Sequence, residues 1–162
     1  MELVLLKRMV IISSILGAIL GVVTVIPAVN VLSFFAIMFL ASPFVIIYMT
    51  KYNMMGVLNL KQTLIYGAII GFISFLGFSL TFVPLATIIG LIYKNSFYLG
   101  VSMLFREGFF VMLLMVVFVA LLGGALMNSF SSLIYHQIRT YFFKDEIDDN
   151  ILNDNIDYEI GE

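Results

Sequence analysis

Long uncharged runs of apolar residues alternate with short charged segments along this chain. Three stretches contain no Asp, Glu, Lys or Arg, namely residues 9–50, 62–93 and 108–138. A charged side chain at the centre of a bilayer costs about 2.5–3.5 kcal/mol on insertion scales, so membrane-spanning segments exclude such residues. The pattern therefore predicts an all-α integral membrane protein.

The first uncharged stretch is too long for one span, because a spanning helix needs about 20 apolar residues. Pro27 divides it, since proline ends or kinks a helix. For the same reason Pro43 should kink the second helix, and Pro84 should end the third. We predict four transmembrane helices in two hairpins, over residues 9–26, 31–49, 63–83 and 109–135.

Residues 85–105, between the third and fourth predicted helices, admit two interpretations. The segment carries one charge, Lys94, flanked by Tyr93, Phe97 and Tyr98. Aromatic rings and a lysine are favoured where lipid meets water, which predicts an interfacial segment lying on the membrane. The alternative is a fifth span with a buried lysine, which the cost of a central charge disfavours.

Basic residues cluster on one side of the four predicted helices. Two, Lys94 and Arg106, fall on the side away from the termini. The other six fall on the side that holds both termini: Lys7, Arg8, Lys51, Lys61, Arg139 and Lys144. The positive-inside rule then predicts a cell-membrane protein with both termini in the cytoplasm, whereas a fifth span would place the C-terminus outside.

The composition of the chain divides it into an apolar part and an acidic C-terminal part. The 162 residues are 62% hydrophobic, against about 45–50% in ordinary soluble domains. Only 11% are charged, and eight of the ten acidic residues follow Lys144, so the net charge of −2 belongs to the C-terminal end. We therefore predict a membrane bundle over residues 1–144 and a disordered acidic tail over residues 145–162, with no nucleic-acid partner.

The acidic tail has two interpretations. Apolar residues recur in it every four or five positions, which is typical of acidic segments that fold on a partner. The tail would then bind a cytoplasmic protein. The alternative is a solvated tail that only aids solubility. The recurring residues are Ile147, Ile151, Leu152, Ile156 and Ile160.

Two pairs of glycines have the same spacing. Gly17 and Gly21 are four residues apart, as are Gly67 and Gly71. This spacing lets helix backbones approach closely in lipid, so each pair predicts a helix contact. The contact joins either helices of one chain or copies of the chain in a homo-oligomer.

The sequence around these glycines also repeats. Gly-Ala-Ile-Leu-Gly, starting at Gly17, returns as Gly-Ala-Ile-Ile-Gly, starting at Gly67. Thr-Val-Ile-Pro, ending at Pro27, returns as Thr-Phe-Val-Pro, ending at Pro84. Two parallel hairpins related by an internal repeat would produce this echo, as in some transporters. Chance similarity in a glycine-rich apolar sequence is the alternative.

The fourth predicted helix carries a polar face. Gly124, Asn128 and Ser132 are spaced by four residues, and Ser131 lies on the same side by helical geometry. One interpretation is the lining of a small cavity for a substrate. The other is structural hydrogen bonding to Ser and Thr residues of the first and third helices, since neutral polar residues mostly serve packing in membranes.

Catalytic chemistry has little support in this sequence. There is no Cys and only one His, which excludes thiolate and histidine-cluster metal sites. No nucleophile–base pair or phosphate-binding loop is recognisable, so we expect no enzyme, cofactor or metal. No carboxylate lies in the uncharged stretches, whereas a proton-coupled pump usually needs an ionisable group within the membrane.

These observations favour a non-enzymatic scaffold or accessory subunit of a membrane complex. Its partners would be the lipid bilayer, further copies of itself, and a cytoplasmic protein bound by the tail. The alternative is a small oligomeric transporter or channel. Its charge-free interior would suit a neutral or lipid-like solute.

Overall fold

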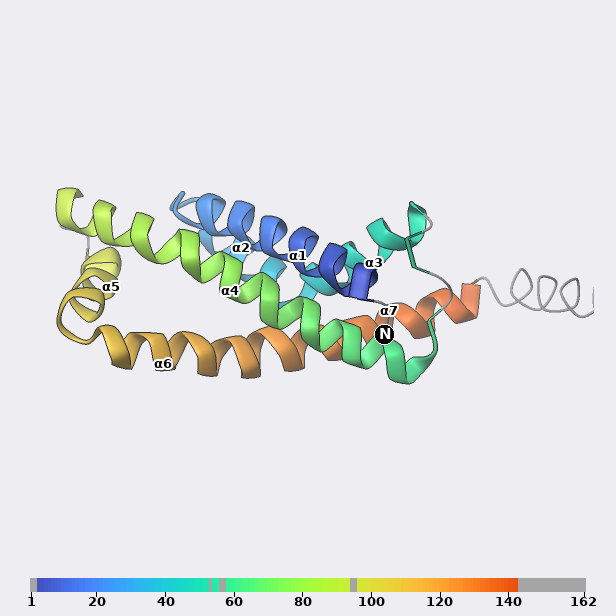
Figure 1. The fold of residues 1–162 in the computed structure, drawn as a ribbon. Coiled ribbons are helices and arrows are strands. Elements are labelled where there is room, and N and C mark those ends of the chain that lie inside the picture. Colours follow the sequence, from blue (N-terminus) through green and yellow to red (C-terminus); the bar gives the residue numbers. More distant parts are fainter. Residues whose placement is uncertain (1–2, 53, 56–57, 94–95, 143–162) are drawn as a thin grey trace, which may run out of the picture.

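A computed structural model describes residues 3–52, 54–55, 58–93 and 96–142 of the chain, and these residues form a bundle of long helices without a strand (Figure 1). Four of the helices are long and apolar enough to cross a membrane: Val4–Thr24, Asn30–Lys51, Leu60–Ile92 and Phe109–Phe142. We call them spans 1 to 4. The all-helical prediction is confirmed, and four helices of membrane-spanning length and apolarity agree with the predicted number, while their insertion in a membrane stays a prediction. The acidic tail, residues 145–162, and Lys94 lie outside the described residues.

Spans 1 and 3 are single α-helices, whereas spans 2 and 4 are each interrupted by a π-helical segment. Span 1 is α1 (Leu3–Thr24) and span 3 is α4 (Leu60–Tyr93). Span 2 comprises α2 (Asn30–Phe35), the π-helical η1 (Ala36–Leu40) and α3 (Ala41–Lys51). Span 4 comprises α6 (Phe109–Val119), the π-helical η2 (Ala120–Leu126) and α7 (Met127–Phe142).

The spans alternate in direction, so the start of α1 and the end of α7 lie at the same end of the bundle (Figure 1). Lys51 ends α3 and Lys61 occupies the second position of α4, at that same end. The short helix α5 (Ser96–Glu107), with Arg106 in its last turn, lies at the opposite end. The arrangement agrees with the predicted grouping of basic residues, and the side that faces the cytoplasm stays a prediction.

Helix α4 is the central element of the bundle, packed against α1 along one face and against η2 and α7 along another. It begins with a capping box that our sequence analysis missed. The Gln62 N–H donates to Asn59 Oδ1 at 2.8 Å, and the Asn59 N–H donates to Gln62 Oε1 at 3.2 Å. Reciprocal bonds of this kind satisfy the first free N–H groups of a helix. The helix therefore starts at Leu60, three residues before the predicted start.

The prediction that Pro84 ends the third helix is wrong, because α4 continues through it to Tyr93. Proline is tolerated inside membrane helices where neighbouring groups support the interrupted backbone. The carbonyl that loses its donor to Pro84 is Leu80 O. The Thr87 Oγ1 hydroxyl donates to a different carbonyl, Val83 O, at 2.8 Å. Helix α5 also packs directly on this end of α4: a Cβ added at Gly90 would lie 2.5 Å from Tyr98 O.

The described residues of the predicted interfacial segment, 85–93 and 96–105, thus belong to the last turns of α4 and to most of α5. Helix α5 has 12 residues, about 18 Å of helix, which is too short for a fifth span. Tyr98 packs inside the protein, with only 3% of its surface exposed, and its predicted level at the membrane interface stays a prediction. Its hydroxyl donates to Val25 O at 2.9 Å and so ties α5 to the turn between spans 1 and 2.

Candidate functional site

The polar residues of span 4 meet an irregular stretch of backbone in span 2. Pro43 has no N–H, so the helical carbonyl four residues earlier, Phe39 O, loses its usual donor. The π-helical η1 (Ala36–Leu40) ends two residues before Ser42, and the kink predicted at Pro43 stays a prediction. Side chains of α7 bond three backbone groups around this irregularity: Ile37 O, Phe39 O and the Ser42 N–H.

Asn128 makes three of the hydrogen bonds at this contact and is fully buried. Its Oδ1 accepts from the Ser42 N–H at 2.8 Å, and its Nδ2 donates to Ile37 O and to Gly124 O, each at 3.0 Å. Reversing the amide would bring Oδ1 against two carbonyl oxygens, so the bonding partners determine its orientation. Both amide hydrogens are used, Oδ1 accepts one bond, and the fully buried side chain faces no open cavity.

Two serines complete the contact. Ser131 Oγ donates to Phe39 O, the carbonyl that Pro43 leaves without a donor. Ser132 Oγ donates to Asn128 O at 2.8 Å and also bonds Ser42 Oγ. We call Ser42, Asn128, Ser131 and Ser132 the polar clamp.

The expected partners of Asn128 were the first and third helices, whereas the clamp joins span 4 to span 2. The missed residue, Ser42, was recognisable only as the neighbour of a proline.

Gly67, Gly71 and Gly124 bring α4 against span 4 beside the clamp. A Cβ added at Gly71 would lie 2.1 Å from Gly124 O, and one added at Gly124 would lie 2.8 Å from Gly71 O. A Cβ at Gly67 would lie 2.4 Å from Ser132 Oγ. The two backbones are therefore in direct contact, which only glycine permits. Six of the predicted site residues come together here, the three glycines with Asn128, Ser131 and Ser132.

Gly17 and Gly21 lie elsewhere, between α1 and α4. A Cβ at Gly17 would lie 1.9 Å from Ser74 O, and one at Gly21 would lie 2.6 Å from Phe78 O. In this structure both predicted glycine pairs make contacts within one chain. They pack against different helices, however, so the internal repeat stays a prediction.

Helix α6 contrasts with the rest of the bundle because it has no buried residue. Its inner face borders two apolar clefts, of about 370 and 220 Å³, and both are lined by Met112 and Val116 of α6 and by Ser79 and Val83 of α4. We call the larger one the α4–α6 cleft. Side chains spaced by four residues point away from the clefts and form the outer stripe of α6: Phe110, Leu114 and Phe118.

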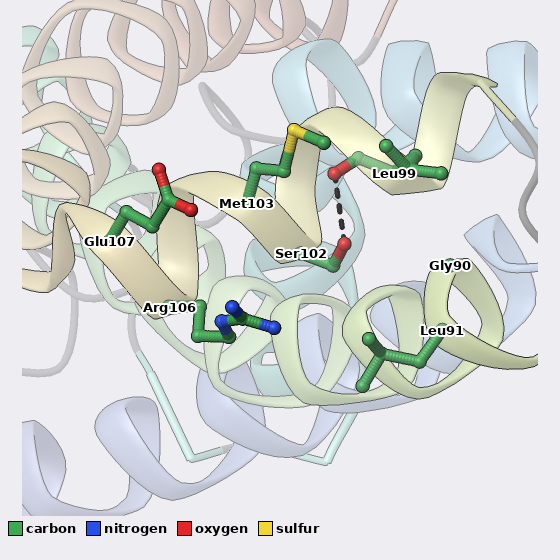
Figure 2. A pocket seen from close by; sticks show the side chains of 7 residues that line it. All are labelled: Gly90, Leu91, Leu99, Ser102, Met103, Arg106 and Glu107. Carbon is green, nitrogen blue, oxygen red and sulfur yellow. Dashed lines mark hydrogen bonds between the residues drawn. The ribbon is translucent and has the colours of Figure 1, made fainter.

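A second, more polar hollow lies between α5 and the end of α4 (Figure 2). We call it the α5 pocket. It has a volume of about 270 Å³, and Arg106 and Glu107 line it together with Leu91, Ser102 and Met103. Arg106 and Glu107 are neighbours in sequence, but they point in different directions and form no ion pair with any described residue (Figure 2).

Comparisons of the chain with protein-family models, with curated proteins and with solved structures found no match. Within the described ranges, no three His, Cys, Asp or Glu side chains gather as a metal site would require. Three features of this structure bear on its function: the polar clamp, the unburied helix α6 and the α5 pocket.

Proposed function

We propose that this protein is a non-enzymatic, multi-pass membrane protein that serves as a scaffold or accessory subunit of a membrane complex. The observation that carries the proposal is α6 (Phe109–Val119), which is wholly apolar and has no buried residue. Span 4 is also the least covered of the four, with 17% of its most apolar window buried, against 33% in spans 2 and 3. Its outer surface is therefore available to another transmembrane helix.

The outer stripe has the chemistry of a helix-docking surface. Phe110, Leu114 and Phe118 are 84%, 69% and 58% exposed. Helices associate in lipid through van der Waals packing, and their interfaces are enriched in small residues, so the large side chains of this stripe need small residues on the partner helix. Aromatic residues are also enriched at protein interfaces. The partner would be a transmembrane helix whose small residues accommodate the two phenylalanines.

A transporter for a lipid-like solute is the second candidate, and the apolar α4–α6 cleft favours it. Transport was expected to use the polar face of span 4 as the lining of a cavity, and the contacts of Asn128 do not support that lining. Asn128 is fully buried and bonded to the backbone of span 2 rather than to an open cavity. The buried clamp thus favours structural hydrogen bonding over a cavity lining as the role of the polar face of span 4.

Site-specific photo-crosslinking in the native membrane tests the proposal. A photoreactive residue at Leu114 should join the chain to one distinct membrane protein. The same residue at Ile15 or Val22, which are 55% and 51% exposed on α1, is the matched control and should give only lipid adducts. Lipid adducts alone at Leu114 would refute the accessory role. A crosslink between two copies of the chain would favour the oligomeric transporter instead.

A further inference from the structure

The α4–α6 cleft and the α5 pocket lie on the same face of α4. Leu80 and Pro84 line the cleft, and Leu91 lines the pocket. Eleven residues separate Leu80 from Leu91, about three helical turns, so the three side chains form one stripe about 16 Å long. Helix α5 joins the two hollows as well, because Phe105 lines the cleft and Arg106 lines the pocket.

The two hollows follow one another along α4, and we call the pair the groove; its first hollow is apolar and its second is lined by charged side chains. The walls of the cleft are apolar apart from Ser79. The charged end carries both a guanidinium and a carboxylate, from Arg106 and Glu107, and neither is neutralised by the other. A ligand that complements this groove needs a long apolar part joined to a head group with one negative and one positive charge.

We propose that the groove binds one bilayer phospholipid whose zwitterionic head group carries a primary amine, as in phosphatidylethanolamine. An acyl chain lies in the α4–α6 cleft, the phosphate pairs with Arg106 and the ammonium donates to Glu107. A guanidinium matches phosphate geometry with two parallel hydrogen bonds, and a carboxylate accepts from an ammonium. This site is separate from the outer stripe, so the proposal stands whether or not a partner helix docks there.

The shape of the cleft favours an acyl chain over a helix as the occupant. Close helix contacts in lipid are made by small residues, as at Gly71 and Gly124 in this protein. The cleft is lined instead by large side chains such as Leu80, Phe105 and Phe109. A helix laid along the cleft would meet these large side chains, whereas a flexible acyl chain fills an irregular gap.

Native mass spectrometry of the full chain in a mild detergent tests the proposal. The protein is incubated with phosphatidylethanolamine, phosphatidylcholine or phosphatidylglycerol of identical acyl chains, and the lipid-bound fraction is measured. Phosphatidylethanolamine should be retained best. Arg106→Gln should lower its retention about 1.5-fold to fivefold, as expected for an exposed ion pair. Arg139→Gln, in the last turn of α7, is the matched control and should leave retention unchanged.

Two further variants keep the proposal testable if Arg106→Gln fails to fold. Glu107→Gln should abolish the preference for ethanolamine over choline, whose quaternary nitrogen has no N–H, while total phospholipid binding persists. Val116→Phe should fill the cleft and lower retention of every phospholipid, whereas Val111→Phe, on the same helix and 58% exposed, should not. Equal retention of the three lipids by the native chain, or a preference for phosphatidylglycerol, would overturn the proposal.

Discussion

Replacing Asn128 by Leu removes the polar atoms at the centre of the clamp while keeping the branching and the number of heavy atoms of the side chain. Two of its three hydrogen bonds cross to span 2, at 2.8 and 3.0 Å. Interhelical hydrogen bonds in membrane proteins contribute about 0.6–1.7 kcal/mol each, which gives about 1–3 kcal/mol for the pair. The change also leaves the buried Ser42 N–H and Ile37 O without these partners, at a further cost of about 1 kcal/mol or more. We expect Asn128→Leu to lower the free energy of unfolding by about 2–4 kcal/mol.

Unfolding by SDS in mixed micelles, followed by far-ultraviolet circular dichroism, measures this loss. Asn30→Leu is the matched control, because Asn30 accepts a bond from the adjacent Val31 N–H at 2.6 Å, outside the clamp. It should cost less than about 1 kcal/mol, because the bond is exposed and water can replace it. Equal losses for the two variants would refute the reasoning that the clamp stabilises the bundle. Lost solute flux in Asn128→Leu at unchanged stability would instead restore the cavity interpretation.

Further predictions follow from the clamp, the glycine contacts and the arrangement of the termini. Pro43→Ala restores an N–H for Phe39 O, so the bond from Ser131 becomes less important. In a double-mutant cycle, Ser131→Ala should therefore destabilise the Pro43→Ala chain less than the native chain, by about 0.5–1 kcal/mol. Strictly additive effects of the two changes would contradict this. Gly71→Ala should lower the free energy of unfolding by more than about 2 kcal/mol, because its Cβ would meet Gly124 O. Gly100→Ala is the control: its Cβ would meet nothing within 4 Å, so this change should raise the free energy of unfolding by up to about 1 kcal/mol. A topology reporter fused after the C-terminus should be active in the cytoplasm, and activity on the other side would contradict the predicted orientation.

The number and approximate extent of the spans were predictable because the cost of a buried charge acts residue by residue. The uncharged stretches therefore located all four long helices. The end of the third helix was not predictable in the same way. Whether a proline ends a helix depends on what packs around it, and Pro84 lies where α5 supports α4. The inner position of Tyr98 has the same origin, since the sequence did not indicate that α5 folds back onto α4.

The candidate site was predictable in part. Spacing by four residues identified Gly124, Asn128 and Ser132 as one face, because helical periodicity is a local property. The partner of that face was not predictable, since it depends on which backbone groups span 2 leaves without donors. The relevant sequence feature was Pro43, which indicates a free carbonyl at Phe39 but not which side chain satisfies it. The groove along α4 also escaped prediction, because it exists only where α5 and α6 meet α4.

The distance along the chain between the two halves of the clamp has a consequence for biosynthesis. Ser42 and Asn128 are 86 residues apart. Ribosomes add about 5–20 residues per second, so about 4–17 seconds separate the synthesis of the two residues. During that interval the backbone of span 2 beside Pro43 has no clamp, and unpaired polar groups are costly in lipid. The nascent first hairpin should therefore depend on insertion machinery to shield it until the last helix arrives.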